Sequence, residues 1–263
     1  MGDLSHEEQK VGIVFGFMKQ ILTFSKRFNS AKLVFCWDSK KSFRKKIYPE
    51  YKKRNPFTEE EIVFEKFAFK QFIELRTYTL PKFGFKNIFI QTGLEADDII
   101  AAIAHNYNRE FVIVSGDEDL YQLLKNNISM YSPKKKKIFT EHDFTKQYGI
   151  TPKEWVMVKR IAGCRSDKVI GIDGIGEKRA IQYLKGTLGK NTKGYQNILD
   201  GQHIIERNKT LVELPFEGTK IPKLMDKETF SINNFIDLTD KYGFRSFQQI
   251  STMNEWVNQF NMK

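Results

Sequence analysis

Apolar and polar positions in the first third of the chain follow two periods. From Val11 to Phe24 apolar residues recur at helical spacing, whereas "KLVFCWD" is a short apolar run that ends in Asp38. A Glu- and Phe-rich stretch from Thr58 to about Tyr78 is typical of a helix. Thr58 with Glu61 three residues later predicts a capping box at its start.

Strand and helix patterns then alternate. "NIFIQ" and "FVIVS" are typical of buried strands, and each is followed by a helical pattern, Glu95 to about Asn106 and Asp119 to about Lys125. This alternation predicts an α/β fold with a mainly parallel sheet and helices on both faces.

Composition limits the class of protein. The 263 residues are 40% hydrophobic, enough to bury a core in one large domain or two lobes. The formal charge of +11 favours an anionic partner such as nucleic acid or a membrane surface, although genomic base composition is an alternative source of the lysines. Two distant cysteines favour a reducing compartment. With neither a membrane span nor a signal peptide in the pattern, we expect a cytoplasmic protein.

Carboxylates follow three of the predicted strands. They are Asp38, the group Glu95, Asp97 and Asp98, and the group Asp117 and Asp119. Because the carboxyl ends of parallel strands share one edge, these acids should converge and need a hard cation such as Mg²⁺ or Mn²⁺. The alternative is that each acid only caps the helix that it precedes.

A glycine-rich segment, "GIDGIGEKRA", lies between two helical patterns. Gly171, Gly174 and Gly176 precede Lys178 and Arg179, so backbone N–H groups and a helix N-terminus could bind a phosphate. The spacing differs from G-x-G-x-x-G, which disfavours a dinucleotide fold. A simple glycine-rich turn is the alternative.

Three ordered motifs carry a family resemblance: "EADD", "SGDEDLYQLL" and "SDKVIGIDGIGEKRA". With "FCWDSKKSFRKKIYPEYKKR" upstream, residues 11 to 185 resemble the 5′-nuclease superfamily of flap endonucleases, phage 5′-3′ exonucleases and the 5′-nuclease domain of DNA polymerase I. The resemblance implies a PIN-like catalytic lobe at 1–150 and a helical, helix-hairpin-helix-type DNA-binding lobe at 151–263.

The resemblance also implies roles for single residues. Lys52 and Arg54 fall near the catalytic cations of the family. Two metal sites are implied, the first at Asp38, Glu95, Asp97 and Asp98 and the second at Asp117, Asp119 and Asp167.

Two segments are implied to bind DNA. An arch at about 39–81 would hold a 5′ single strand, with bases stacked on aromatic rings and phosphates bound by basic side chains. The hairpin from Gly171 to Gly176 would bind the duplex backbone and could hold K⁺. The arch residues are Phe43, Arg44, Lys45, Lys46, Tyr48 and Tyr51.

Two departures from the family pattern stand out. The family opens with a strand ending in "DGNN", and Asp3 follows no apolar strand that could replace it. Cys164 stands where the family has an acid, and Lys168 where it has Asn. We therefore expect a weakened metal site, because a thiol is a poor Mg²⁺ ligand.

The function expected is a divalent-metal-dependent 5′-3′ nuclease for DNA with a 5′ flap, nick or end, and for RNA–DNA hybrids, in replication or repair. We expect a monomer that works with replication proteins. One alternative is a catalytically degenerate DNA-binding protein of the same fold. Another is a ribonuclease of the related toxin-like fold, which the glycine hairpin disfavours.

Overall fold

The computed structural model describes residues 5–6, 9–54 and 56–263, and the chain in it forms two compact units. One unit contains residues 1–35, 55–89 and 223–263, and the other contains residues 36–54 and 90–222. These units are built from separate segments, whereas the lobes expected at 1–150 and 151–263 are continuous and stay a prediction. The expected α/β class with a helical lobe is confirmed.

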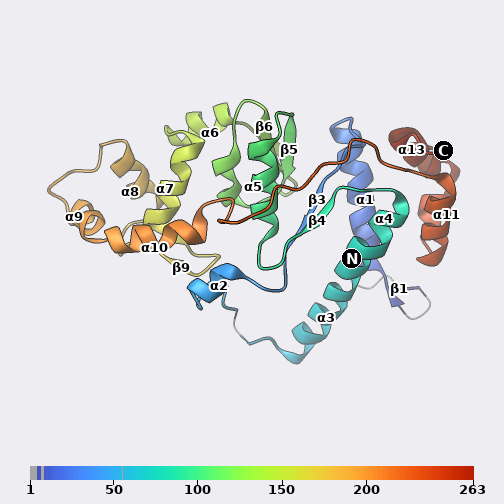
Figure 1. Ribbon diagram of the computed structural model, residues 1–263, viewed down its shortest axis with the longest axis horizontal. Helices are drawn as coiled ribbons and strands as arrows, with labels where there is room; N and C mark the ends of the chain where they lie inside the picture. The colour runs from blue at the N-terminus through green and yellow to red at the C-terminus, as the bar shows by residue number, and fades with distance from the viewer. Residues whose placement is uncertain (1–4, 7–8, 55) are drawn as a thin grey trace. The chain divides into compact units, whose positions relative to one another are not determined.

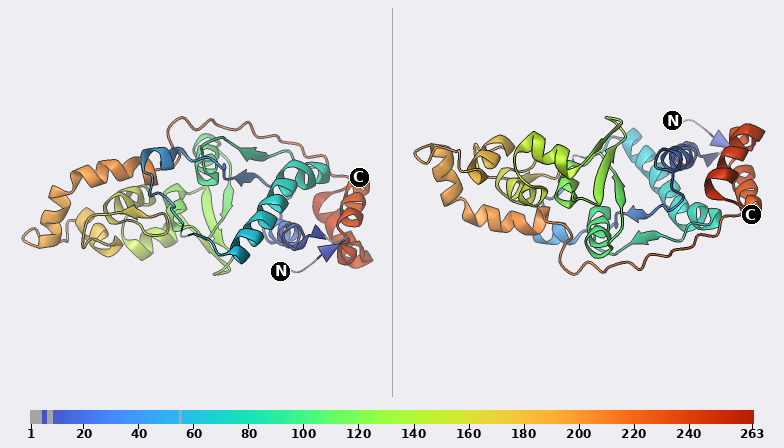
Figure 2. Two further views of the ribbon diagram at one scale, coloured as in Figure 1. Left: turned by 90° about the horizontal axis from the view of Figure 1, so that it is seen from below. Right: turned by 90° about the horizontal axis from the view of Figure 1, so that it is seen from above.

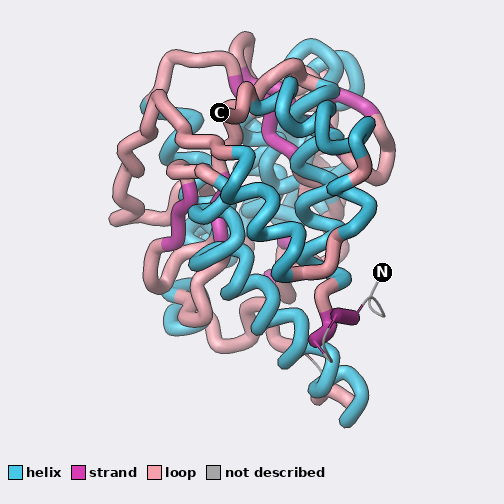
Figure 3. The backbone as a smooth tube through the Cα atoms, turned by 90° about the vertical axis from the view of Figure 1, so that its right-hand side faces the viewer, coloured by secondary structure: helices cyan, strands magenta, loops and turns pink. Residues whose placement is uncertain are grey.

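The first unit is almost entirely helical, and helices dominate the backbone drawn in Figure 3. Its rings of Phe83, Phe235, Trp256 and Phe260 pack with centroids 5.2 to 5.9 Å apart. Its elements are β1 (Ser5–His6), β2 (Gln9–Lys10), α1 (Gly12–Arg27), α3 (Glu59–Glu74), the π-helix η1 (Leu75–Thr79), α4 (Leu80–Phe83), α11 (Ile232–Lys241), α12 (Arg245–Gln248) and α13 (Ile250–Phe260).

Helix α3 begins with the predicted capping box. The Thr58 side chain accepts a hydrogen bond from the Glu61 N–H, and the Glu61 carboxylate accepts one from the Thr58 N–H. Every side chain from 59 to 67 is exposed, and burial begins at Ala68 and Gln71. The first half of α3 therefore buries little of its side-chain surface, although Lys10 lies over the Phe67 ring at 5.1 Å.

The second unit contains the remaining helices and sheets. Strands β5 and β6 are parallel, with Phe111 opposite Ile128, and β6 and β7 are antiparallel. Its elements, apart from the strands described next, are α2 (Phe43–Ile47), α5 (Ala96–Asn106), β5 (Phe111–Val114), the 3₁₀-helix η2 (Glu118–Leu123), β6 (Ile128–Ser132), β7 (Lys137–Phe139), α6 (Glu141–Tyr148), α7 (Pro152–Ala162), β8 (Gly163–Cys164), β9 (Val169–Ile170), α8 (Glu177–Leu184), α9 (Lys193–Asp200) and α10 (Gln202–Val212).

Two further strands, β3 (Phe35–Trp37) and β4 (Ile88–Ile90), pair with each other. The chain passes from one unit to the other within these strands. The strands are therefore shorter and divided among more small sheets than the expected single parallel sheet. The four-lysine run at 134–137 is exposed to solvent and forms the turn between β6 and β7 and the first residue of β7.

Helix α7 lies at the centre of the second unit (Figure 1). Trp155, Val158 and Ile161 are fully buried along one face of it. On another side α7 packs on α10, where the Arg160 guanidinium donates to the Ile205 carbonyl at 3.1 Å.

The end of α7 leads into the predicted hairpin. Gly163 ends the helix with φ of 76°, β8 and β9 pair, and α8 begins after Gly176. Figure 2 shows α8 and α9 on the side of α7 away from β5 and β6. Within the described ranges, the structure has no helix with the length and apolar character needed to cross a membrane.

Candidate active site

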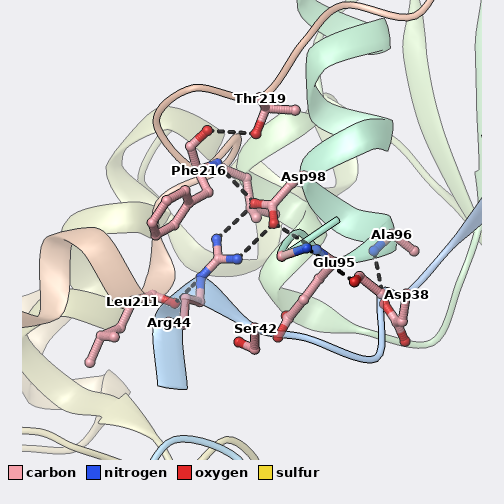
Figure 4. A network of polar contacts seen from close by, with 12 residues as sticks. Asp38, Ser42, Arg44, Glu95, Ala96, Asp98, Leu211, Phe216 and Thr219 are labelled. Carbon is pink, nitrogen blue, oxygen red and sulfur yellow. Dashed lines mark hydrogen bonds and ion pairs between the residues drawn. The ribbon is translucent and has the colours of Figure 1, made fainter. Parts of the chain in front are cut away.

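Asp38 lies at the end of β3, as the sequence predicts, and next to the start of α5. Its Oδ1 accepts a hydrogen bond of 2.8 Å from the Ala96 N–H, and the Ser39 N–H donates to the Leu94 carbonyl at 3.0 Å (Figure 4). These bonds hold the exposed Asp38 carboxylate beside Glu95 and Asp97 on α5. The acids after β3 and β4 are therefore brought together.

Asp98 has a different place from the one expected. It is fully buried, and its two oxygens accept hydrogen bonds from the Arg44 guanidinium at 2.7 and 2.8 Å (Figure 4). The N–H groups of Glu95 and Phe216 donate to it at 3.0 and 2.8 Å. Each oxygen thus accepts two hydrogen bonds, a full set for a carboxylate. The prediction of Asp98 as a metal ligand is wrong, because its oxygens already bind the protein.

Arg44 is corrected by the same contact. Its side chain is 2% exposed, and its Nε donates to the Leu211 carbonyl at 3.0 Å. The guanidinium therefore ties α2 to α5 and to the end of α10, and it is not available to a phosphate.

Tyr51 and Lys52 lie between Glu95 and Asp167. The Tyr51 hydroxyl is 3.0 Å from Glu95 Oε2 and 3.2 Å from Asp167 Oδ2. Lys52 Nζ is 2.8 Å from Glu95 Oε2 and 3.8 Å from Asp167 Oδ2. Burial and the two carboxylates raise the pKa of Tyr51, so its hydroxyl keeps its proton and donates. Tyr51 is 2% exposed, so the prediction that it stacks on a base is wrong.

Lys52 keeps its charge for a related reason. Burial alone lowers the pKa of Lys52, but the Glu95 and Asp167 carboxylates more than compensate and raise it above its ordinary value. The Lys52 N–H also donates to the Asp167 carbonyl at 2.8 Å. This predicted catalytic cation is therefore fixed among the acids, whereas the Arg54 side chain is exposed.

Two acids carry strongly raised pKa values. Burial and the charge of Asp117 raise the pKa of Asp97 to about 7, with Lys52 acting in the opposite direction. Burial raises the pKa of Asp167 to about 6, again against Lys52, with Asp119, Glu95 and Asp117 adding to the rise. Like charges held close together in this way repel each other, and a bound cation would relieve the repulsion.

Asp117 also caps η2, since its Oδ1 accepts a hydrogen bond from the Asp119 N–H at 2.9 Å.

A second cluster contains Asp119, Cys164 and Asp167. One ligand atom from each residue lies within 4.8 Å of the other two. Cys164 Sγ is 3.4 Å from Asp119 Oδ2, and burial raises the pKa of this thiol to about 11. Two acids of the expected second group, Asp119 and Asp167, thus lie together with a sulfur, whereas Asp117 is not part of this cluster.

The sequence interpretation missed Lys159 in this cluster. Its Nζ is 3.0 Å from Asp119 Oδ1 and 2.9 Å from Glu177 Oε1, and its side chain is 8% exposed. The available signal was a lysine on the apolar face of α7, four residues after Trp155.

The basic and aromatic residues of α2 divide into two groups. Lys45 and Lys46 are exposed, as expected for phosphate contacts. Phe43 instead packs against Gly93, where a Cβ would lie 2.4 Å from the Phe43 ring, and Tyr48 lies under the Arg207 guanidinium at 5.1 Å. Both side chains are half-buried, so base stacking by Phe43 and Tyr48 stays a prediction.

The hairpin glycines serve different needs. Gly171 lies so close to α7 that a Cβ would come within 2.2 Å of the Ala162 carbonyl, and Gly174 has φ of 71°. Gly176 has open space where its Cβ would be. Lys178 is exposed, while Arg179 Nη1 donates to the Gly174 carbonyl at 2.7 Å.

Asp3, which the sequence analysis considered as a substitute for the N-terminal acid of the family, lies outside the described residues.

Comparison with known proteins identifies a matching family and several relatives. Residues 3–149 match the family described as 5′-3′ exonuclease, N-terminal resolvase-like domain. A 5′-3′ exonuclease of Buchnera aphidicola subsp. Schizaphis graminum is 32% identical over 221 residues, which cover 82% of this chain and 70% of that protein. A 5′-3′ exonuclease of Mycoplasma pneumoniae is 32% identical over 240 residues, covering 82% and 79%.

A solved structure has the same fold. The T5 D15 protein, crystallised with metal ions, superposes with a TM-score of 0.67 at 25% identity, over 76% of this chain and 80% of that one. The matching family and these relatives are described as 5′-3′ exonucleases, and the acids assembled around Lys52 suit such an activity. The chain therefore belongs to the 5′-3′ exonuclease family, and it is a 5′-3′ nuclease with the resolvase-like fold.

Proposed function

We propose that the chain hydrolyses phosphodiesters in DNA near a junction between single strand and duplex, using divalent metal ions. One observation carries the proposal. The carboxylates of Asp38, Glu95 and Asp117, which follow β3, β4 and β5, lie close enough to Asp97 to raise its pKa, and Lys52 pairs with Glu95 at 2.8 Å. Acids held together around a fixed cation are the arrangement that phosphoryl transfer by metal ions needs.

The first metal site would use Asp38, Glu95, Asp97 and Asp117. These are oxygen donors, which suit Mg²⁺ or Mn²⁺, and the raised pKa of Asp97 reflects charges that a dication would relieve. The metal, when bound, would lower the pKa of a water and offset charge on the phosphate. The second site would use Asp119 and Asp167.

Side chains near the two metal sites would bind the phosphate and orient the metal ligands. Lys52 is within reach of both predicted sites, so its ammonium would offset the negative charge that grows on the phosphate in the transition state. The Tyr51 hydroxyl, which lies within hydrogen-bond distance of Glu95 and Asp167, would donate its one proton to either of them and so help to orient the pair. Arg54, exposed two residues later, would bind a neighbouring phosphate.

A single 5′ strand would be bound partly by α3. Four phenylalanines of this helix are between 39% and 58% exposed: Phe64, Phe67, Phe69 and Phe72. Base stacking on aromatic rings stabilises single-strand binding without sequence preference. These side chains would take the stacking role first expected of Tyr51. Lys45 and Lys46 of the other unit are proposed separately as phosphate contacts.

The hairpin would bind the duplex through its backbone and through Lys178. Gly176 precedes α8 with open space around it, which supports a close approach by a phosphate. The carbonyls of Asp173 and Gly174 each accept one hydrogen bond, from Asn197 and Arg179, so each has a second lone pair that a K⁺ ion could use. We propose K⁺ binding at these carbonyls in the presence of duplex.

The wider context is proposed on similar grounds. The two free cysteines support a reducing, cytoplasmic setting. We propose a monomer that acts beside replication proteins. We also propose that it accepts RNA in hybrids, because stacking and backbone contacts do not depend on the bases.

Cleavage of a 5′-labelled flap in Mg²⁺, Mn²⁺ or EDTA tests the proposal. We expect metal-dependent release of short 5′ fragments, with Asp117→Asn inactive and flap affinity within about threefold of wild type, the range of a lost rim contact. The matched control is Asp200→Asn on α9, which lies outside the acid group. Tight binding without cleavage in any metal would instead indicate a degenerate DNA-binding protein.

A further inference from the structure

Two donor atoms of the second cluster have the spacing found between ligands of one metal ion. Ligands about 2.0 to 2.3 Å from a tetrahedral ion lie about 3.3 to 3.7 Å from each other. Cys164 Sγ and Asp119 Oδ2 are 3.4 Å apart, and the third donor, from Asp167, completes a group within 4.8 Å. Only a small closure of the cluster is needed to surround a cation.

Lys159 weakens the attraction of this cluster for a hard cation. Its ammonium binds Asp119 Oδ1 at 3.0 Å and offsets part of the charge of that carboxylate. The other oxygen, Oδ2, is the one that lies 3.4 Å from Cys164 Sγ. Mg²⁺ depends on charge and on oxygen ligands, so it loses affinity here, whereas a metal–thiolate bond has a larger covalent part and is weakened less by a nearby ammonium.

We infer that Asp119, Cys164 and Asp167 form a site for a thiophilic divalent cation, Zn²⁺ in the first place, instead of a second Mg²⁺ site. The Cys164 thiol loses its proton to solvent as its sulfur binds the metal. Asp119 contributes Oδ2, while Lys159 holds Oδ1. The inference deepens the proposed function, because this is the second metal site of that proposal.

Cobalt reports sulfur ligation directly. One equivalent of Co²⁺ added to the reduced full chain should produce a thiolate-to-cobalt charge-transfer band in the near ultraviolet. Cys164→Ser should lose the band, and Cys36→Ser, the matched control at the other cysteine, should keep it. Circular dichroism of each variant verifies its fold.

Competition in the wild-type chain needs no variant. Stoichiometric Zn²⁺ should remove the cobalt band, whereas a large excess of Mg²⁺ should leave it. In Cys164→Asp the ratio of Zn²⁺ to Mg²⁺ affinity should fall by at least about tenfold, the loss typical of a damaged metal site.

Three results would overturn the inference: no band in the reduced wild-type chain, an equal band in folded Cys164→Ser, or Mg²⁺ displacing Co²⁺ as readily as Zn²⁺ does. None of these measurements depends on cleavage. A chain that binds Co²⁺ through Cys164 but never cuts DNA would refute the proposed function and leave this site intact.

Discussion

The guanidinium of Arg44 binds both oxygens of Asp98, at 2.7 and 2.8 Å, and neither side chain is more than 2% exposed. The pair joins α2 to the first turn of α5, and Glu95 N–H binds the same carboxylate at 3.0 Å. Asp98 therefore positions the proposed metal ligands beside it without being one of them.

Arg44→Met should destabilise the fold by about 3 to 5 kcal/mol, because it leaves the Asp98 charge buried without its partner. The free energy of unfolding, from urea titration, measures this. Lys53→Met is the control, since its ion pair with Glu50 is exposed on both sides and should contribute less than about 1 kcal/mol. Equal losses in the two variants would contradict the importance of burial.

Tyr51→Phe should reduce metal-dependent cleavage by about 10- to 100-fold, as removal of a group that orients metal ligands does. Stability should change by only about 1 kcal/mol, the net value of one hydrogen bond. Initial rates on a 5′-labelled flap measure the effect, with Tyr195→Phe on α9 as control. An unchanged rate would show that Glu95 and Asp167 are held in place without the hydroxyl.

The metal-free protein should lose stability as pH rises from about 4 to 7. The folded-state pKa values of Asp97 and Asp167, about 7 and about 6, exceed their ordinary 3.8, so the folded state binds more protons in this window. Raising the pH removes those protons and with them the stability. Denaturant midpoints in EDTA measure the slope, and Asp97→Asn should reduce it. A steeper slope in Asp97→Asn would refute the assignment.

Gly176→Ala should weaken duplex binding several-fold whatever the base sequence, because the added methyl enters open space where a phosphate would approach. Gly116→Ala also adds a methyl into open space and serves as the control. Fluorescence anisotropy with two unrelated duplexes measures both. If the two variants bind alike, the hairpin is a structural turn.

Cys164→Asp should raise the Mg²⁺-dependent cleavage rate more than the Mn²⁺-dependent rate, because it replaces a soft donor with an oxygen. The ratio of the two rates, from initial velocities, is the quantity to compare. The prediction fails if the wild-type chain already cuts rapidly in Mg²⁺ and the ratio stays constant.

Much of the local structure could be predicted because its causes are local. The capping box of Thr58 and Glu61 involves residues three apart, and the acids at strand ends follow from the apolar runs before them. Gly171 and Gly174 mark a turn because only glycine fits these positions easily. Such features need no knowledge of distant partners.

The errors concern partners far apart in the sequence. Arg44 and Asp98 are 54 residues apart, and nothing in either neighbourhood shows that the two neutralise each other. An acid at a strand end and a base in a basic run have the same pattern whether they bind a ligand or one another. Tyr51 was misjudged for the same reason, since its two carboxylate partners lie 44 and 116 residues away.

The exposed first half of α3 has a consequence for its motion. Side chains 59 to 67 are exposed and would give up little buried surface on unwinding, so backbone hydrogen bonds and the Thr58–Glu61 cap, worth about 1 kcal/mol, provide much of the resistance to it. We therefore expect this segment to unwind more readily than the core. Its amide hydrogens should exchange with solvent before those of α7, and a ligand that orders it would pay an entropic cost that a rigid surface would not.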